Sequence, residues 1–448
     1  MTQKDTTLFH SSGSAQHFLL SKSNTRQLRS EKIKSVAGIM EVLRSAFPDM
    51  LAGQRFIEYA LQQLASINQF AAMVVRVDHM QPDDEANTHS ATMDGQVEVA
   101  GILDTVCQIE NGMWGAFEPG LFGSFLPDKD GSESLRIARD IQKRLLEKTQ
   151  KTLTIGVASY PTLTYTQPET LNNAHKALDH ASFFGPNSAV VFDGVSLNIS
   201  GDNLYEDGKI QEAIEELKKA LMLEPSNVNV HNSLGVCYGL QGKYETATAE
   251  FNAAVSIDPD EYMALYNLGL VCMLTERRDQ ALEYFTKAEK INANVFEIAF
   301  HIGKLNLELG YPAKSKPYLE HAAKLSPESG TVYRYLGDCY TEGNLPQAAI
   351  TAYKKAIQKN PQDAAAMSAL GYILNELKEN PEIALMFCRE SVDLAPENAL
   401  FRYRLGRLYS NQEHFDEALK EFTIAKQLGY DAGRDIQQIK DRLVAKSS

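Results

Sequence analysis

Two acidic residues in the first half of the chain lie where a pair of carboxylates could hold a metal ion. Asp78 lies near the end of "FAAMVVRVDH" (70–79), which has the pattern of a buried strand, and Glu118 lies in "MWGAFEPGLFGSFLP" (113–127), which has the pattern of a β-hairpin. Carboxylates from a strand end and a turn can bind Mg²⁺ and stabilise the charge that develops in phosphoryl transfer. Arg76 precedes Asp78 by two residues, however, and one carboxylate beside a guanidinium is a poor magnesium site. We expect Arg76 to form a salt bridge instead.

The segments around these residues alternate between strand and helix patterns. Apolar runs bounded by turn residues indicate strands, and apolar residues three and four apart indicate helices. The order predicts an α+β domain in which helices back a sheet that contains antiparallel strands. The expected elements are a strand (70–79), a helix (96–109), the hairpin (113–127), a helix (133–148), a strand (153–161), a helix (169–185) and a strand (188–193).

Several short motifs in this region follow a known family pattern. In order along the chain they are "FLP" (125–127), "LTIGVA" (153–158) and "AHKALDHASFFGPN" (174–187). With these motifs, residues 48–193 resemble the GGDEF (diguanylate cyclase) domain, although "DMLAGQRF" (49–56) is three residues shorter than the family's first motif. The resemblance implies a domain that once carried a two-metal nucleotide site.

The residues at the family's catalytic positions do not fit that chemistry. Counted back from the proline of the hairpin, the metal-binding acid falls on Gly120 and the next acid on Leu121, while Glu118 stands where the first glycine is expected. In the strand, Arg76 replaces the metal-binding Asp, and Asp78 matches the second Asp, which is not a ligand. The resemblance therefore implies no cyclase activity, no metal and no cofactor.

Two further family positions are also lost. The lysine that ends the late helix motif is Ser182, and the Arg-x-x-Asp product-inhibition motif reads as residues 109–112, "IENG". A retained pocket for GTP or cyclic di-GMP stays open as an alternative.

The second half of the chain is a repeat with a period of 34 residues. A helix-ending proline follows most units, and small residues recur at two fixed distances after one glycine of each unit, which indicates paired amphipathic helices packed closely. Seven units over 194–428 resemble the tetratricopeptide repeat, with one extra residue near "LKENPE" in the sixth unit and a capping helix over 429–448. The repeating glycines are Gly201, Gly235, Gly269, Gly303, Gly337, Gly371 and, after 35 residues, Gly406.

The resemblance implies an all-α solenoid, a right-handed superhelix whose concave face binds a peptide or a partner helix. The first helix of each unit lines that face, and the cations and aromatic residues expected there suggest an acidic or C-terminal-carboxylate ligand. The lysine, asparagine and arginine set of a two-carboxylate clamp is absent, because those positions read Asn198, Asp202 and Ser233. The residues expected on the face are Tyr266, Met273, Lys304, Arg334, Tyr372, Tyr403 and Arg407; alternatively they are ordinary solvated helix residues.

Composition limits the remaining possibilities. A formal net charge of −14 argues against general binding to nucleic acid or to an anionic membrane. Five single cysteines within apolar helical patterns indicate buried thiols in a reducing compartment, and no run reaches the length of a membrane span, so we expect a cytoplasmic, bacterial-type protein.

The sequence thus predicts a polar, mobile tail (1–30), a connecting amphipathic helix (31–47), the GGDEF-like domain, the array and its cap. We expect a non-catalytic scaffold or signalling adaptor that binds a protein partner. A nucleotide receptor that acts on a partner through the array is the alternative. The oligomeric state stays open, with a dimer through the N-terminal domain as one possibility.

Overall fold

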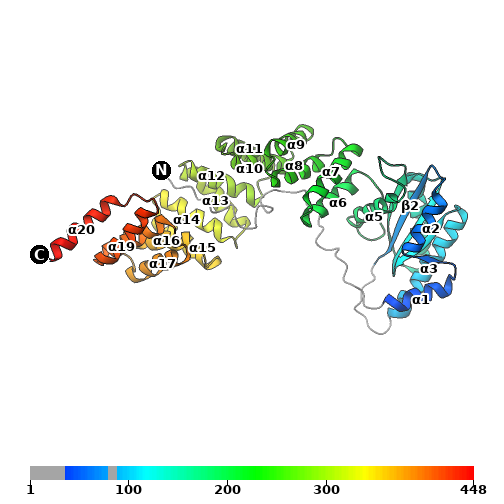
Figure 1. The fold of residues 1–448 in the computed structure, drawn as a ribbon, viewed down its shortest axis with the longest axis horizontal. Coiled ribbons are helices and arrows are strands. Elements are labelled where there is room, and N and C mark those ends of the chain that lie inside the picture. Colours follow the sequence, from blue (N-terminus) through cyan, green and yellow to red (C-terminus); the bar gives the residue numbers. More distant parts are fainter. Residues whose placement is uncertain (1–35, 79–87, 448) are drawn as a thin grey trace. The chain divides into compact units, whose positions relative to one another are not determined.

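The computed structural model describes residues 36–78 and 88–447, and the predicted tail lies outside the described residues (Figure 1). The chain forms two compact units, Met1–Asn267 and Leu268–Ser448, which divide within one helix of the array. The first unit therefore combines the α/β domain with the beginning of the array. Among the helices that the structure describes, none combines the length and apolar composition needed to cross a bilayer.

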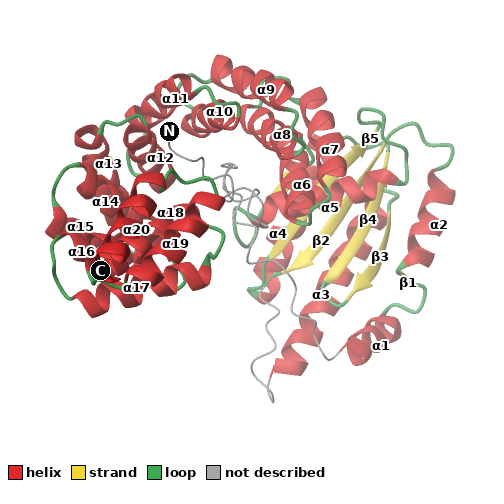
Figure 2. Cartoon of the chain, turned by 60° about the vertical axis from the view of Figure 1, so that its left-hand side comes forward, coloured by secondary structure: helices red, strands yellow, loops and turns green. Residues whose placement is uncertain are grey.

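The α/β domain contains a mixed six-stranded sheet (Figure 2). Its strand order is β1-β3-β4-β2-β5-β6, with antiparallel pairing from β3 through β4 and β2 to β5, and parallel pairing at both edges. The elements are α1 (Val36–Ala46), β1 (Leu51–Ala52), α2 (Gln54–Leu64), β2 (Phe70–Val77), α3 (Thr88–Ile109), β3 (Met113–Glu118), β4 (Leu121–Pro127), α4 (Gly131–Thr149), β5 (Leu153–Tyr160), α5 (Glu169–Ser182) and β6 (Ala189–Val191).

Helices cover both faces of this sheet. On one face, Met73 and Val75 of β2 share a core with side chains of α1, α3 and α4. On the other face, α5 lies so close to β5 that a Cβ at Gly156 would collide with the backbone of Ala174 and Leu178. Ile39 and Leu43 of α1 belong to the core that α3 and α4 form on the first face, so the described part of the predicted connecting helix (36–46) packs as part of the α/β domain.

The array consists of paired helices, as the repeat predicts. We call the first helix of each pair the A helix and the second the B helix. Each repeating glycine stands where the two helices meet: a Cβ at Gly269 or Gly406 would lie 2.7 Å from the ring of Phe285 or Phe422. The pairs are α6 (Gly194–Glu206) with α7 (Ile210–Leu223), α8 (Val228–Leu240) with α9 (Tyr244–Ile257), α10 (Tyr262–Leu274) with α11 (Arg278–Ile291), α12 (Phe296–Glu308) with α13 (Pro312–Leu325), α14 (Gly330–Glu342) with α15 (Pro346–Lys359), α16 (Ala364–Glu376) with α17 (Pro381–Leu394), and α18 (Ala399–Asn411) with α19 (Phe415–Gln427), followed by α20 (Gly433–Ser447).

The sixth pair has the longer turn that the extra residue predicts. Two residues of this turn, Lys378 and Asn380, have positive φ angles of 55° and 44°. All five cysteines are buried free thiols, as the sequence predicts. Burial raises the pKa of the Cys107 thiol to about 12, with the nearby Asp104 adding to the rise, so this thiol is unreactive near neutral pH.

Polar contacts join α5 of the α/β domain to the first helix pair. Lys176 of α5 forms an ion pair with Glu216 of α7, and the ammonium groups of Lys176 and Lys219 lie 5.5 and 4.6 Å from the ring centre of Tyr165. Asp193 caps the start of α6 and lies 3.2 Å from Nδ1 of His180. The first pair of the array is therefore attached to the α/β domain by side chains as well as by the chain itself.

Candidate functional site

The A helices of the second unit carry most of the residues predicted to bind a peptide. Lys304 lies on α12, Arg334 on α14, Tyr372 on α16, and Tyr403 and Arg407 on α18. We call the surface formed by these four A helices the A-helix face.

Two predicted residues lie elsewhere, on α10. Tyr266 has no exposed surface, so its side chain is not available to a peptide, contrary to the prediction. Met273 is half-buried and belongs to the second unit.

Arg334 is held by the next helix pair. Its side chain is 14% exposed, and its Nε lies 3.4 Å from Oδ2 of Asp363, the residue that caps α16 by accepting a hydrogen bond from the Ala366 amide. The guanidinium also lies 4.6 Å from the ring centre of Tyr335. This cation therefore links two consecutive helix pairs before any ligand binds.

Asp338 lies one helical turn after Arg334 and accepts a hydrogen bond from the Tyr353 hydroxyl at 2.6 Å. Burial raises the pKa of the Asp338 carboxyl, while the Tyr353 hydrogen bond and the guanidinium groups of Arg334 and Arg404 act in the opposite direction. Arg404 in turn donates to Ser368 at 3.3 Å. Three A helices, α14, α16 and α18, thus contribute to one group of charges.

Sequence reasoning missed Arg404, Tyr335 and Asp338. The repeat register contained the signal, because Tyr335 and Arg404 both stand two residues before the glycine of their unit. Arg404 also lies over the Tyr372 ring, with 5.5 Å between its guanidinium carbon and the ring centre, so it touches a residue that the sequence did single out.

Lys304 and Arg407 also face carboxylates of the chain. Lys304 is 15% exposed and lies 3.7 Å from Glu308, whereas Arg407 is 35% exposed and lies 3.9 Å from Glu376 and 3.6 Å from Asp435. Tyr403, one turn before Arg407, stacks on Tyr430 with ring centres 4.3 Å apart.

A row of carboxylates ends the same A helices. Glu308, Glu342 and Glu376 are the last residues of α12, α14 and α16, spaced by 34 residues, and all three are exposed. Partial burial raises the pKa of the Glu342 carboxyl, and the nearby Asp338 adds to the rise. The A-helix face therefore carries mixed charge and is not the cationic surface that the sequence predicts.

The first helix pairs hold a buried polar group at the clamp positions. Asp202 is 2% exposed and accepts hydrogen bonds from Ser233 at 2.9 Å and from Asn198 at 3.4 Å. Burial raises the pKa of the Asp202 carboxyl to about 7, Glu206 adds to the rise, and the Ser233 hydrogen bond opposes it.

In the α/β domain, Asp78 is bound to neighbouring elements. One carboxylate oxygen accepts from the Thr154 hydroxyl at 2.6 Å, and the other accepts from the backbone N–H of Asn187 at 2.8 Å. These bonds join the end of β2 to β5 and to the loop after α5.

Arg76 points to a different partner from the one expected. Its guanidinium donates to the Ser182 hydroxyl at 2.8 Å, and within the described part of the chain it forms no ion pair with Asp78 or Glu118. Partial burial raises the pKa of the Asp179 carboxyl, and the nearby Arg76 acts in the opposite direction. The prediction of a salt bridge is therefore wrong. Both oxygens of Asp78 already accept hydrogen bonds from Thr154 and Asn187, and Glu118 lies exposed at the end of β3.

The hairpin forms as predicted, with its turn at Pro119 and Gly120. Gly120 has a φ of 78°, and its amide donates to the side chain of Gln96 at 2.9 Å. Leu121 pairs with Arg76 across β4 and β2, so the hairpin turn and the end of β2 are adjacent. Over residues 36–78 and 88–447, no group of three or more histidine, cysteine, aspartate or glutamate side chains is placed to hold a metal ion.

Comparison with known families confirms the repeats. A family model described as "TPR repeat" matches residues 201–242, and one described as "Tetratricopeptide repeat" matches 241–295, 302–364 and 340–399. These residues are tetratricopeptide repeats, and they form an all-helical solenoid. The matches do not include the α/β domain, and no curated protein matches the chain.

Solved structures with similar folds include several repeat proteins. The pilF protein of Pseudomonas aeruginosa is 21% identical, with a TM-score of 0.43, over 47% of this chain and 95% of its own. YrrB, described as a TPR protein with an unusual peptide-binding site, is 22% identical, with a TM-score of 0.39, over 41% of this chain and 95% of its own. A chain of the APC/C hetero-tetramer Cut9-Hcn1 is 15% identical, with a TM-score of 0.41, over 69% of this chain and 54% of its own.

Proposed function

We propose that the chain is a non-catalytic interaction scaffold or adaptor, whose A-helix face binds a segment of a protein partner. Tetratricopeptide solenoids generally serve as scaffolds, because stacked helix pairs offer an extended surface for a partner. Partner binding on the A-helix face would use cations and aromatic rings from consecutive pairs, such as Tyr372 of α16 and Arg407 of α18.

Arg407 is the predicted cation of the A-helix face that a partner can reach most easily. Arg407 is the most exposed of the three predicted cations, and its carboxylate neighbours lie at 3.6 and 3.9 Å, beyond good hydrogen-bond distance. A carboxylate from a partner can approach this guanidinium with two hydrogen bonds, which is stronger than either existing contact. An acidic side chain or a C-terminal carboxylate is therefore the ligand group that we assign to Arg407.

Arg334 is less accessible to a partner than Arg407. Because it is 14% exposed and bound to the cap of α16, a ligand would have to displace Asp363 to reach it. Arg334 and Lys304 would then stay bound within the chain, while the half-buried rings of Tyr372 and Tyr403 would supply apolar contact.

The test compares partners recovered with wild-type chain and with Arg407→Glu. Lys420→Glu is the matched control, since Lys420 is an exposed lysine on the B helix α19. We expect Arg407→Glu to reduce recovery of specific partners by at least about tenfold, and Lys420→Glu to leave it unchanged. Recovery of every partner with Arg407→Glu would overturn the assignment of the face. For a recovered partner peptide, amidation of its C-terminus distinguishes a terminal carboxylate from an acidic side chain.

We also propose that the α/β domain is a GGDEF-like domain without catalysis. The order of strand, helix, hairpin, helix, strand, helix and strand supports this, as does the pairing of the hairpin with β2. Arg76, at a metal-binding position of the family, and Ser182, at the position of the late helix lysine, bond to each other, and Asp78 joins the end of β2 to β5. Arg76, Asp78 and Ser182 therefore bind other residues of the chain, which supports a structural role for them.

Incubation of purified chain with GTP and Mg²⁺ or Mn²⁺ tests this second proposal. We expect no turnover, and no rise in melting temperature with millimolar GTP or cyclic di-GMP. Turnover would contradict the absence of catalysis, whereas stabilisation without turnover would favour the nucleotide receptor.

The five buried free thiols support a reducing compartment, and on that ground we propose that the protein is cytoplasmic.

A further inference from the structure

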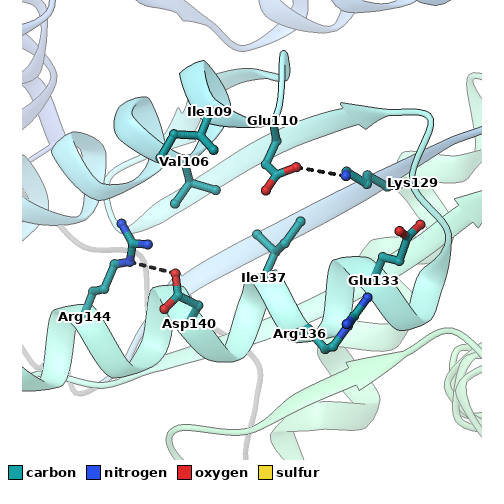
Figure 3. A pocket seen from close by; sticks show the side chains of 9 residues that line it. All are labelled: Val106, Ile109, Glu110, Lys129, Glu133, Arg136, Ile137, Asp140 and Arg144. Atoms are coloured by element: carbon teal, nitrogen blue, oxygen red, sulfur yellow. Dashed lines mark ion pairs between the residues drawn. The ribbon is translucent and has the colours of Figure 1, made fainter.

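A shallow groove runs between α3 and α4 on the α/β domain (Figure 3). Its volume is about 280 Å³, and the side chains of Val106 and Ile137 form its apolar floor. Ile109, at the end of α3, is 64% exposed beside this floor. Ile109 and the floor together offer a small apolar area that a second copy can cover, and the charges around the groove decide which partner fits it.

The α4 side of the groove carries charges of alternating sign. Glu133, Arg136, Asp140 and Arg144 lie at spacings of three and four residues, so they share one face of the helix with Ile137. Their signs are negative, positive, negative and positive from the first to the last. Such a series becomes complementary to itself when a second copy runs in the opposite direction.

The spacing of these charges fits one antiparallel register. Glu133 would face Arg144 of the second copy, and Arg136 would face Asp140. Along α4, the midpoint between Glu133 and Arg144 and the midpoint between Arg136 and Asp140 lie about half a residue apart. A helix rises 1.5 Å per residue, so this offset is under about 1 Å. All four pairs can therefore form together, with Ile137 near the centre.

We propose that two copies of this chain associate through α4, packed antiparallel across a two-fold axis near Ile137. Such an interface is isologous, since each contact of one copy is repeated by the other. Ile109 and the apolar floor would be covered by the α4 of the second copy. This inference goes beyond partner binding by the array, and each assembly would present two arrays.

The charges of the groove favour a second copy over a small anion. Lys129 is paired with Glu110 at 2.9 Å, and Arg144 with Asp140 at 2.7 Å, so carboxylates balance the cations. Arg136 is exposed and, in the part of the chain that the structure describes, belongs to no ion pair. The face of a second α4 offers this guanidinium a carboxylate, which is Asp140.

The experiment measures the mass of the full chain by sedimentation velocity up to about 100 μM, because a contact of one helix pair is smaller than a standard interface and is expected to be weak. The variants are Arg136→Glu and Asp140→Arg, each of which sets like charges against each other twice. Arg139→Glu is the control, since Arg139 is exposed on α4 outside the groove.

We expect the wild-type mass to rise from 49.8 kDa towards twice that value with concentration. Each groove variant alone should associate at least about tenfold more weakly, and Arg139→Glu should behave as wild type. An equal mixture of Arg136→Glu and Asp140→Arg should form a mixed dimer, because each variant then meets the opposite charge. This recovery also shows that both variants are folded.

Four results would each overturn the proposal. The wild-type chain could remain monomeric at the highest concentration, in which case the groove serves a different partner. Arg136→Glu could dimerise as strongly as wild type, or the mixture could fail to recover association. Loss of the dimer with Arg139→Glu would likewise show that the net charge of the helix, and not the register, controls association.

Discussion

The ion pair between Lys176 and Glu216 allows a direct test of whether the α/β domain and the first helix pair are energetically coupled. The two side chains are 22% and 10% exposed, and Glu216 also accepts a hydrogen bond from Ser200 of α6 at 2.7 Å. Lys176→Met would remove the cation and leave the carboxylate largely buried with the Ser200 hydroxyl as its remaining partner.

The expected cost follows from burial. Removing one partner of a buried pair destabilises by about 3–5 kcal/mol, and partial exposure reduces this because water screens part of the charge. We expect Lys176→Met to lower the free energy of opening this region by about 2–3 kcal/mol. Amide hydrogen exchange in α5 and α6 should then be about 30- to 150-fold faster, since about 1.4 kcal/mol corresponds to a factor of ten.

Hydrogen exchange measured on peptides from α5 and α6 gives the local value, which a global melting curve of a chain with two units does not. Adding Glu216→Gln to Lys176→Met should restore most of the protection, because a neutral amide can still accept from Ser200. The exposed pair of Lys143 and Glu147, 4.0 Å apart, is the control, and Lys143→Met should change exchange less than about threefold. Unchanged exchange in Lys176→Met would refute the coupling.

Three further predictions follow from single side chains. Asp78→Ala should lower stability by about 2–3 kcal/mol, because the Thr154 hydroxyl and the Asn187 amide both lose a charged acceptor; a loss below about 0.5 kcal/mol in denaturant unfolding would count against this. Gly406→Ala should cost about 1–3 kcal/mol in the same assay, since the new methyl group meets the Phe422 ring, and an unchanged midpoint would contradict the proposed helix contact. The folded-state pKa of Asp202 is raised from 3.8 to about 7, so the unfolded state releases this proton first and stability should fall as pH rises from 4 to 7. Asp202→Asn should remove that part of the pH dependence of the melting temperature, and a parallel profile for the variant would show that other groups cause it.

The repeat was predictable because its signals are local and recur. Glycines at a fixed spacing mark where A and B helices meet, and the structure has a helix pair around each of them. The hairpin was predictable for a similar reason, since turn residues separate two apolar runs. The short β1 and the helix α2 were not predicted, because two strand residues and a shortened motif give little pattern.

Side-chain partners were much less predictable. Arg76 and Ser182 are 106 residues apart, so only the fold brings them together, and Arg334 pairs with a helix cap in the following repeat. Tyr266 occupies an expected surface position but is buried, which the single-helix pattern of an apolar segment does not reveal. The sequence thus placed most of these residues on the first helix of each pair, but it did not predict the charge balance around them.

The contacts of α5 with the first helix pair also bear on why the α/β domain accompanies the array. A repeat solenoid exposes an apolar surface at each end, and each end needs a cover. At the C-terminal end α20 packs on α19, and at the N-terminal end α5 packs on α6, whose first residue follows the Asp193 cap. The α/β domain therefore closes the array as a terminal repeat would. A domain that we propose to be without catalysis would still serve the helices that follow it, by covering the first end of their array.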